Sequence, residues 1–181
     1  MSPPRIVDVV RTYLELRSPS QLRASHIEDP AVQFVHRAGI AAHHYRRLYR
    51  SVGDQWQWTD RNAWSDARLD AHLRRPAIAV WECLVADETA GFFELEQSDD
   101  GSVEIAYFGL VEQFIGRGLG KAMLTRAVEE AWTLGPTRVW LHTCTLDSPH
   151  ALPNYKARGF EAVRTETYKL QLPGDCHHER A

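Results

Sequence analysis

Two neighbouring stretches decide the fold: VEIAYFGL at residues 103–110 and GRGLGK at residues 116–121. The first is rich in β-branched and aromatic residues and predicts a strand over Val103 to Val111. The second places three glycines at alternate positions, where an amphipathic helix predicted from about Gly118 to Leu134 begins. Glycines let the backbone approach a bulky anion, and free N–H groups at a helix start can bind that anion.

The glycine-rich turn allows two interpretations. Arg117 and Lys121 add positive charge beside the backbone donors, which makes a pyrophosphate the natural ligand. The phosphate-loop pattern needs Ser or Thr after the lysine, but Ala122 stands there. The dinucleotide pattern needs the first strand of a βαβ unit, and this turn follows several strands. A connection that only caps the helix is the alternative.

The flanking periodicities predict an α/β (α+β) fold, with helices on both faces of one twisted sheet. Short polar turns separate three consecutive strands, which is typical of an antiparallel meander. Residues 21–38 show no clear pattern. The predicted strands are 6–16, 77–86, 90–96, 103–111, 138–143 and 160–170, and the predicted helices are 40–49, 66–74, 118–134 and 149–158.

The amino-acid composition excludes several classes of protein. The 181 residues carry a net charge of −3 and 44% hydrophobic residues, so the chain is long and apolar enough to form a core. The mild acidity argues against nucleic acid as the main partner. No apolar run has the ~20 residues of a membrane span, and residues 1–5 do not resemble a signal peptide. Three cysteines without a CxxC pair indicate a reducing cytoplasm and no metal site.

A second motif lies near the end of the chain. Ala151 to Phe160 follow the pattern A-x-x-x-Y-x-x-x-G-F, with Tyr155 and Gly159 at its fixed positions. With Arg117-Gly118-Leu119-Gly120, the strand before it and the order of elements, this sequence resembles the GCN5-related N-acetyltransferase (GNAT) family. The resemblance extends from about Ala77 to Leu170 and implies a twisted, mixed, mostly antiparallel sheet.

This resemblance implies a reaction and a domain plan. The donor would be acetyl-coenzyme A (acetyl-CoA), without a metal, and the acceptor a primary amine on a small molecule, an amino-acid derivative or a peptide. We expect one GNAT-like domain over residues 1–181. Its parts would be an acceptor-side portion (1–76), a cofactor-binding core (77–171) and a flexible, solvated tail (172–181).

The resemblance also implies which residues hold acetyl-CoA. A bulge predicted at Gly109 would expose backbone groups, and the N–H of Phe108 or Leu110 would polarise the acetyl carbonyl. Ile115 stands where the family has Gln or Arg, and Ser148 stands where it often has Asn. The predicted cofactor-binding residues are Phe108, Leu110, Ile115, Gly116, Arg117, Gly118, Leu119, Gly120, Lys121 and Ser148.

Amine acetylation needs an acid and a base. Tyr155 stands at the family's thiolate-protonating position, although a packed tyrosine is the alternative. Glu104 matches the catalytic glutamate of the histone-acetylating branch, and a salt-bridged glutamate is its alternative. Simple alternation places Glu104, Ala106 and Phe108 on one face of the strand. Glu94 on the preceding strand could replace Glu104 as base or anchor the amine.

The acceptor side is predicted from aromatic residues. Tyr45, Trp56 and Trp58 could form a wall that holds a cationic amine, together with Glu94. Alternatively, these rings close the core over two short helices. The sequence thus predicts an N-acetyltransferase, with a homodimer possible. A non-catalytic acyl-CoA-binding sensor or partner subunit is the alternative function.

Overall fold

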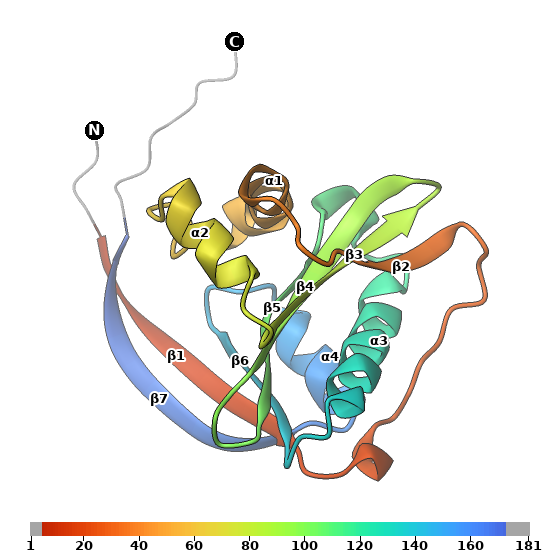
Figure 1. Cartoon of the computed structure of the whole chain (residues 1–181). Coiled ribbons are helices and arrows are strands. Elements are labelled where there is room, and N and C mark those ends of the chain that lie inside the picture. The colour runs from red at the N-terminus through yellow and green to blue at the C-terminus, as the bar shows by residue number, and fades with distance from the viewer. Residues whose placement is uncertain (1–4, 173–181) are drawn as a thin grey trace.

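The computed structural model describes residues 5–172, which form one seven-stranded sheet with helices on both faces (Figure 1). The sheet order is β2-β3-β4-β5-β6-β1-β7. The strands are β1 (Arg5–Leu16), β2 (Val32–His36), β3 (Ile78–Val85), β4 (Glu88–Gln97), β5 (Val103–Leu110), β6 (Val139–Cys144) and β7 (Glu161–Leu172). The helices are α1 (Ala42–Gly53), α2 (Asp66–Leu73), α3 (Leu119–Thr133) and α4 (Ala151–Ala157), with 3₁₀ turns at Pro19–Gln21, Asp54–Trp56 and Glu112–Phe114.

The predicted fold class is confirmed, with most elements near their predicted bounds. The unassigned segment contains β2, a five-residue edge strand that pairs with β3. Helix α4 begins at Ala151 rather than Pro149. Pro153 therefore lies in its first turn, where the missing N–H breaks no helical hydrogen bond. The predicted tail lies, apart from Leu172, outside the described residues.

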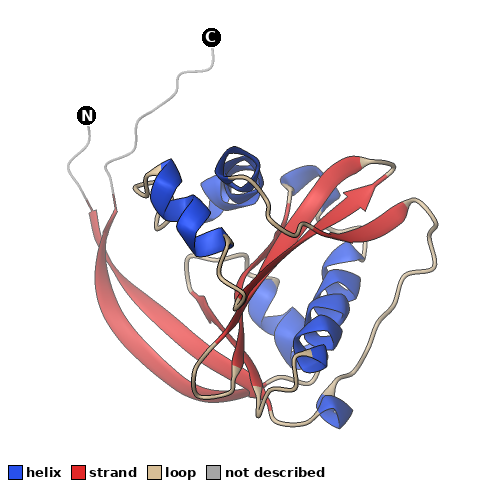
Figure 2. Ribbon diagram, in the orientation of Figure 1, coloured by secondary structure: helices blue, strands red, loops and turns tan. Residues whose placement is uncertain are grey.

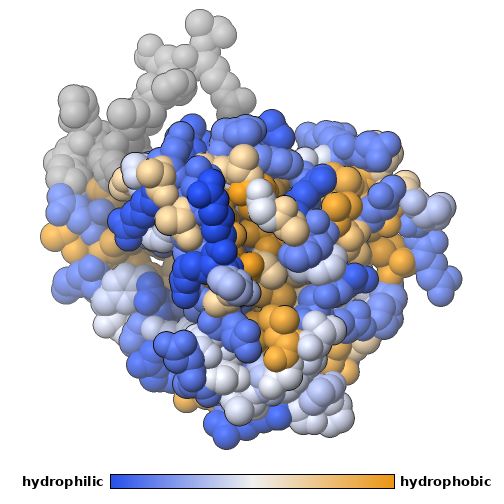
Figure 3. Space-filling view, viewed as in Figure 1, coloured by the Kyte–Doolittle hydropathy of each residue, from blue (hydrophilic) through white to orange (hydrophobic). Residues whose placement is uncertain are grey.

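Helices lie on both sides of the sheet (Figure 2), and a hydrophobic cluster fills the space between the sheet and the helices on each side. Helix α3 packs its apolar face, including Met123, Leu124 and Val128, into the larger cluster. Helices α1 and α2 bury Tyr45 and Leu69 in the smaller cluster on the opposite face. In the view of Figure 3, hydrophilic residues dominate the outer surface and hydrophobic residues emerge only in separate patches. Among residues 5–172, no helix is long and apolar enough to cross a membrane.

The sheet opens between β5 and β6. These two strands are parallel and pair only at Val103–Val139 and Glu104–Trp140, at the start of each strand. The chain crosses from one to the other through α3, as a parallel connection requires. Beyond Glu104 the strands separate, so the remaining edge of β5 is free of β6.

A bulge in β5 corrects the predicted alternation. The β4–β5 register shifts between Glu94–Tyr107 and Leu95–Ile105, so the additional residue is Ala106 and not Gly109. Ile105 and Phe108 both contact the cluster beneath α3, whereas Tyr107 contacts the α1–α2 cluster. Glu104 and Phe108 therefore lie on opposite faces. Gly109 has a different role, because a Cβ there would lie 2.4 Å from Cγ1 of Val52.

Strand β1 lies between β6 and β7, antiparallel to both. Side chains of directly paired residues share a face of the sheet. Tyr13 pairs with His142 and Arg164, so these three side chains share a face with Arg11. Leu14 and Leu16 point to the other face and join the cluster beneath α3. The N-terminal strand therefore supplies residues to both faces of the C-terminal part of the sheet.

Gly159, after α4, is required by the fold. Its φ is +103°, and a Cβ there would lie 2.0 Å from the backbone oxygen of Gln21. The adjacent hydrogen bond from Arg23 N to Arg158 O, at 2.9 Å, holds the two segments together. The glycine of the closing motif thus allows the segment after β1 to pack against the end of α4.

We expect Gly159→Ala to lower the free energy of unfolding by about 3 kcal/mol or more, through backbone strain and the clash with Gln21. Gly39→Ala is the matched control, because Gly39 has φ +64° and no atom within 4 Å of the added Cβ. The control should cost only about 1–2 kcal/mol. Urea denaturation of both variants measures the difference, and equal losses would contradict the proposed clash.

Candidate functional site

A cavity of about 550 Å³ occupies the opening between β5 and β6. Its wall is built from both faces of the sheet. One end is formed by the glycine-rich loop, the start of α3 and α4. The other end is formed by the 56–60 loop, β1 and β7. The lining includes Ile115, Gly116, Gly118, Gly120, Lys121, Ser148, Asn154 and Tyr155 at the first end, and Arg11, Trp56, Trp58, Asp60, Tyr107, His142 and Tyr168 at the second.

The loop end is suited to bind an anion through its backbone. Gly116 and Gly118 have φ of +83° and +79°, the left-handed region that glycine adopts without strain. In the described part of the chain, their N–H groups have no hydrogen-bond acceptor. They precede α3, whose first N–H groups and dipole also favour an anion.

The side chains of the loop divide into two groups. Lys121 and Ile115 line the cavity. Leu119 is 3% exposed and packs in the core, so only its backbone is available. The guanidinium of Arg117 lies 5.1 Å from the ring centre of Phe114 and does not line the cavity.

The free edge of β5 presents backbone groups to the cavity. Val111 N donates to Ala90 O at 2.9 Å, which fixes the hydrogen-bonding phase of the β4–β5 ladder. Antiparallel strands alternate these directions, so the N–H groups of Phe108 and Leu110 point away from β4 and into the opening. These are the two donors predicted from the sequence.

Helix α4 and the segment just before it contribute Asn154 and Ser148 to the cavity near the loop. Ser148 lines the cavity, and its Oγ accepts a hydrogen bond from His150 N at 3.3 Å. Asn154 was missed by sequence reasoning, although its position beside Tyr155 could have indicated it. Its Nδ2 donates to Gly120 O at 3.3 Å, which ties α4 to the start of α3.

Tyr155 is buried yet reaches the cavity. It is 6% exposed and packs edge-to-face against Phe108 and Phe160, with ring centres 6.0 and 6.2 Å away. Burial raises the pKa of its hydroxyl well above the ordinary value, and Asp147 adds to this rise. The phenol is therefore protonated at neutral pH and can donate a proton.

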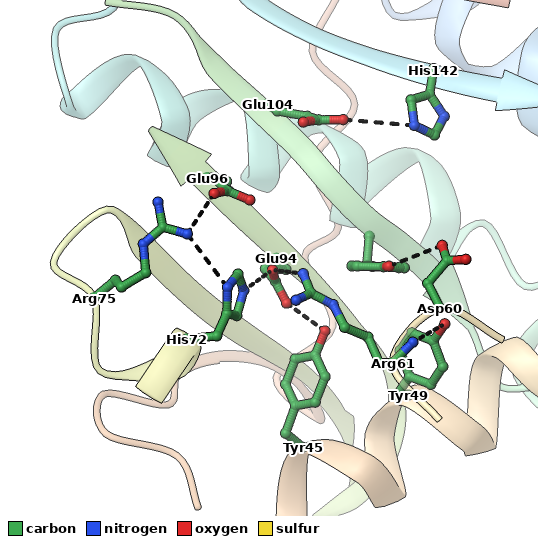
Figure 4. Close-up of polar contacts among 11 residues, drawn as sticks. Tyr45, Tyr49, Asp60, Arg61, His72, Arg75, Glu94, Glu96, Glu104 and His142 are labelled. Atoms are coloured by element: carbon green, nitrogen blue, oxygen red, sulfur yellow. Dashed lines mark hydrogen bonds and ion pairs between the residues drawn. The ribbon is translucent and has the colours of Figure 1, made fainter. Parts of the chain in front are cut away.

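Glu104 and His142 form a pair on the opposite face, where the strands separate (Figure 4). Glu104 Oε1 lies 3.8 Å from His142 Nε2. Burial, with the charges of Glu96 and Glu94, raises the pKa of Glu104 to about 7. Burial and the nearby charge of Arg11 lower the pKa of His142, so its imidazole is neutral at pH 7. Both groups can accept a proton near neutral pH.

The aromatic wall is present in part. Trp56 and Trp58 both line the cavity. Trp58 also packs against Tyr49 and Tyr107, at 5.6 and 5.2 Å between ring centres, so it belongs to the core as well. Asp60 Oδ2 accepts from the Tyr107 hydroxyl at 3.4 Å and adds a carboxylate to this end.

Tyr45 and Glu94 do not reach the cavity, which corrects their prediction as substrate-binding residues. Both are 0% exposed. Glu94 accepts from the Tyr45 hydroxyl at 2.5 Å and from Arg61 Nη2 at 2.9 Å, and it lies 2.9 Å from His72 Nε2 (Figure 4). Its oxygens are fully engaged, so Glu94 is neither a free base nor an anchor for an amine. The set of four instead fastens α1, the 61–65 segment and α2 to β4.

One group of residues could hold a metal ion by distance alone. Ligand atoms of His72, Glu94 and Glu96 lie within 4.8 Å of one another. Arg61 bonds Glu94 and Arg75 bonds Glu96 at 2.8 Å, however, so both carboxylates already have a cationic partner. Cys144 lines the cavity, and burial raises the pKa of its thiol, which disfavours a thiolate nucleophile.

Solved structures with the same fold include a GCN5-related N-acetyltransferase from Kribbella flavida, with a TM-score of 0.65 and 20% identity. The match covers 94% of this chain and 61% of that one. One from Sphaerobacter thermophilus has a TM-score of 0.66 and 13% identity, over 95% of this chain and 54% of that one. An aminoglycoside acetyltransferase from an uncultured soil metagenomic sample has a TM-score of 0.61 and 16% identity. That match covers 72% of this chain and 88% of the other chain.

The first two comparisons mean that this chain spans about three fifths and about half of those longer chains. At these identities, the likeness shows the fold alone. A search of curated protein sequences found no match. The sequence model of the Acetyltransferase (GNAT) family, however, matches residues 43–160, more than half of the chain. The chain therefore belongs to the GNAT family of acetyltransferases.

Proposed function

We propose that this protein transfers an acetyl group from acetyl-CoA directly to a primary amine. The observation that carries the proposal is the cavity between β5 and β6. It connects an anion-binding loop and a protonated tyrosine on one side with His142 on the other side, and Glu104 lies 3.8 Å from His142. The solved aminoglycoside acetyltransferase of the same fold acts, by its name, on an amine-bearing substrate, which fits this acceptor class.

The residues at the loop end fit acetyl-CoA, which when bound would supply the acetyl thioester. The N–H groups of Gly116 and Gly118, with Lys121, would hold the pyrophosphate. The edge of β5 would pair with the pantetheine amides through the backbone of Phe108 and Leu110. One of these N–H groups would also stabilise charge on the acetyl oxygen.

The opposite end would prepare the acceptor. An ammonium has no free electron pair, so a base must take a proton before the nitrogen attacks. Glu104 is suited to this step because its pKa of about 7 leaves a useful carboxylate fraction at neutral pH. His142 Nε2, 3.8 Å from Glu104, would relay the proton toward solvent, since it is 37% exposed.

Tyr155 would assist departure of the coenzyme A thiolate, the leaving group of the reaction. Burial keeps the proton on the phenol, and the hydroxyl would donate a hydrogen bond or its proton to the sulfur as negative charge develops on the departing thiolate. A non-catalytic acyl-CoA-binding protein would need the loop but neither Tyr155 nor the Glu104–His142 pair. Tyr155 and His142 line the same cavity, and Glu104 lies 3.8 Å from His142, which favours an enzyme.

We expect Tyr155→Phe to lower kcat by about 100-fold or more while acetyl-CoA binding changes little, because only the proton donor is removed. The ring still packs against Phe108 and Phe160, so stability is kept. Thiol release measures turnover against a panel of amines, and calorimetry measures cofactor binding. Unchanged turnover in the variant would mean that another group protonates the thiolate, whereas cofactor binding without any turnover in the wild-type protein would favour the binding-protein alternative.

The pH profile tests Glu104. For the wild-type protein, kcat/KM should rise as pH passes about 7, because the base works only when deprotonated. Glu104→Gln should lose this limb and about 100-fold in rate at pH 8. The acceptor chosen for this assay should have an amine pKa far from 7, so that its own titration is separate.

A stability measurement controls the same variant. The folded-state pKa of Glu104 is raised above its ordinary value, so ionisation weakens the folded state as pH rises toward 7. The neutral amide that Glu104→Gln introduces lacks this penalty, and the variant should be at least as stable as wild type at pH 8. A rate loss accompanied by unfolding would remove the support for a base.

A further inference from the structure

We propose that the acceptor amine carries a carboxylate, and that Arg11 binds this carboxylate beside the Glu104–His142 pair. The inference rests on the proposed function and names its substrate class: an α-amino acid or a close derivative with a free carboxylate. Four observations carry it: the position of Arg11, its unused donors, the signs of the charges at this end and the aromatic wall.

The sheet register places Arg11 beside the base pair. Arg11 on β1 pairs with Cys144, and Tyr13 pairs with His142, so Arg11 and His142 are diagonal neighbours on one face. Arg11 lines the cavity. At this distance its positive charge lowers the pKa of Glu104 and of His142.

Several N–H groups of the Arg11 guanidinium make only weak hydrogen bonds or none within the described residues. Its Nη2 donates to the Tyr168 hydroxyl at 3.2 Å, and its Nη1 makes only a long contact of 3.5 Å to Glu166. Its Nε is buried and has no partner among residues 5–172. The Tyr13 hydroxyl and Arg164 also contact Glu166, so that carboxylate is shared between several groups. A planar fork with free N–H groups, 33% exposed at a cavity wall, matches a carboxylate.

The other charges at this end are negative. Asp60 lines the cavity, and Glu104 lies 3.8 Å from His142, which also lines it. Both carboxylates would attract an ammonium, while Arg11 supplies a positive charge at the same end. This arrangement complements a zwitterion. One arginine next to two carboxylates suits a single negative charge better than the double charge of a phosphate, so we assign a carboxylate. Trp56 and Trp58 would then contact the side chain of the amino acid.

Matched acceptor pairs test the inference. Each pair differs at the carboxylate. Phenylalanine would be compared with phenethylamine, with its amide and with its aminophosphonate analogue, and tryptophan would be compared with tryptamine. Wild-type kcat/KM should be at least 10-fold higher for the free amino acid than for each partner. Arg11→Met should lower kcat/KM for the amino acid by roughly 10- to 100-fold more than it lowers kcat/KM for the simple amine.

Arg164→Met is the matched control. Arg164 lies on the same face of the sheet, stacks on Tyr13 at 3.9 Å and does not line the cavity. This variant should behave as wild type, while Arg11→Lys should recover part of the preference. Equal losses for amino acid and amine in Arg11→Met, or equal wild-type rates for both, would overturn the inference. A higher rate with the aminophosphonate would also overturn it.

A binding measurement separates this inference from the proposed function. If no acceptor on the panel is acetylated although acetyl-CoA binds, the proposed function fails. Thermal unfolding with coenzyme A then tests Arg11 alone. Phenylalanine should raise the melting temperature of the wild-type protein and of Arg164→Met, but not of Arg11→Met. Absence of this stabilisation in the wild-type protein would overturn the carboxylate site.

Discussion

Strands β5 and β6 pair at only two positions, and the candidate site depends on this limited pairing. Because the pairing stops after Glu104, the backbone groups of Phe108 and Leu110 have no partner strand and face an opening. The same opening lets one cavity contact both faces of the sheet. Tyr155 from the α4 face and His142 from the other face therefore line one cavity, although a continuous sheet would separate them.

A buried ionic network holds the acceptor end in place. Glu94 takes hydrogen bonds from Tyr45 and Arg61 and contacts His72, and none of the four is more than 9% exposed. Arg61 also stacks on Trp64 and Tyr107, at 4.1 and 5.1 Å from their ring centres. Removing Glu94 or Arg61 would leave the charge of the other buried and unpaired, which costs about 3–5 kcal/mol. The network thereby fixes the loop that carries the two cavity tryptophans and Asp60.

The elements whose structure depends on residues close together in the sequence could be predicted from it. The meander, α3 and the glycine turn follow from periodicity and turn residues, and the structure contains all three. The bulge at Ala106 was not predictable, because a register shift depends on the neighbouring strand. Glu94 looked like a functional acid because its burial partners come from distant segments. Arg11 gave no signal for the same reason: its place beside His142 exists only after β1 pairs with β6.

The insertion of β1 between β6 and β7 has a consequence for how the protein forms during synthesis. Arg11 is made more than a hundred residues before its partner Cys144 and its other neighbour Glu166. The meander and α3 involve short sequence separations and can assemble on the ribosome. The β6-β1-β7 part closes loops of more than a hundred residues, so it is expected to form last and slowly. Until then, the apolar face of β1 with Leu14 and Leu16 stays uncovered, which makes this strand the segment that chaperones must shield.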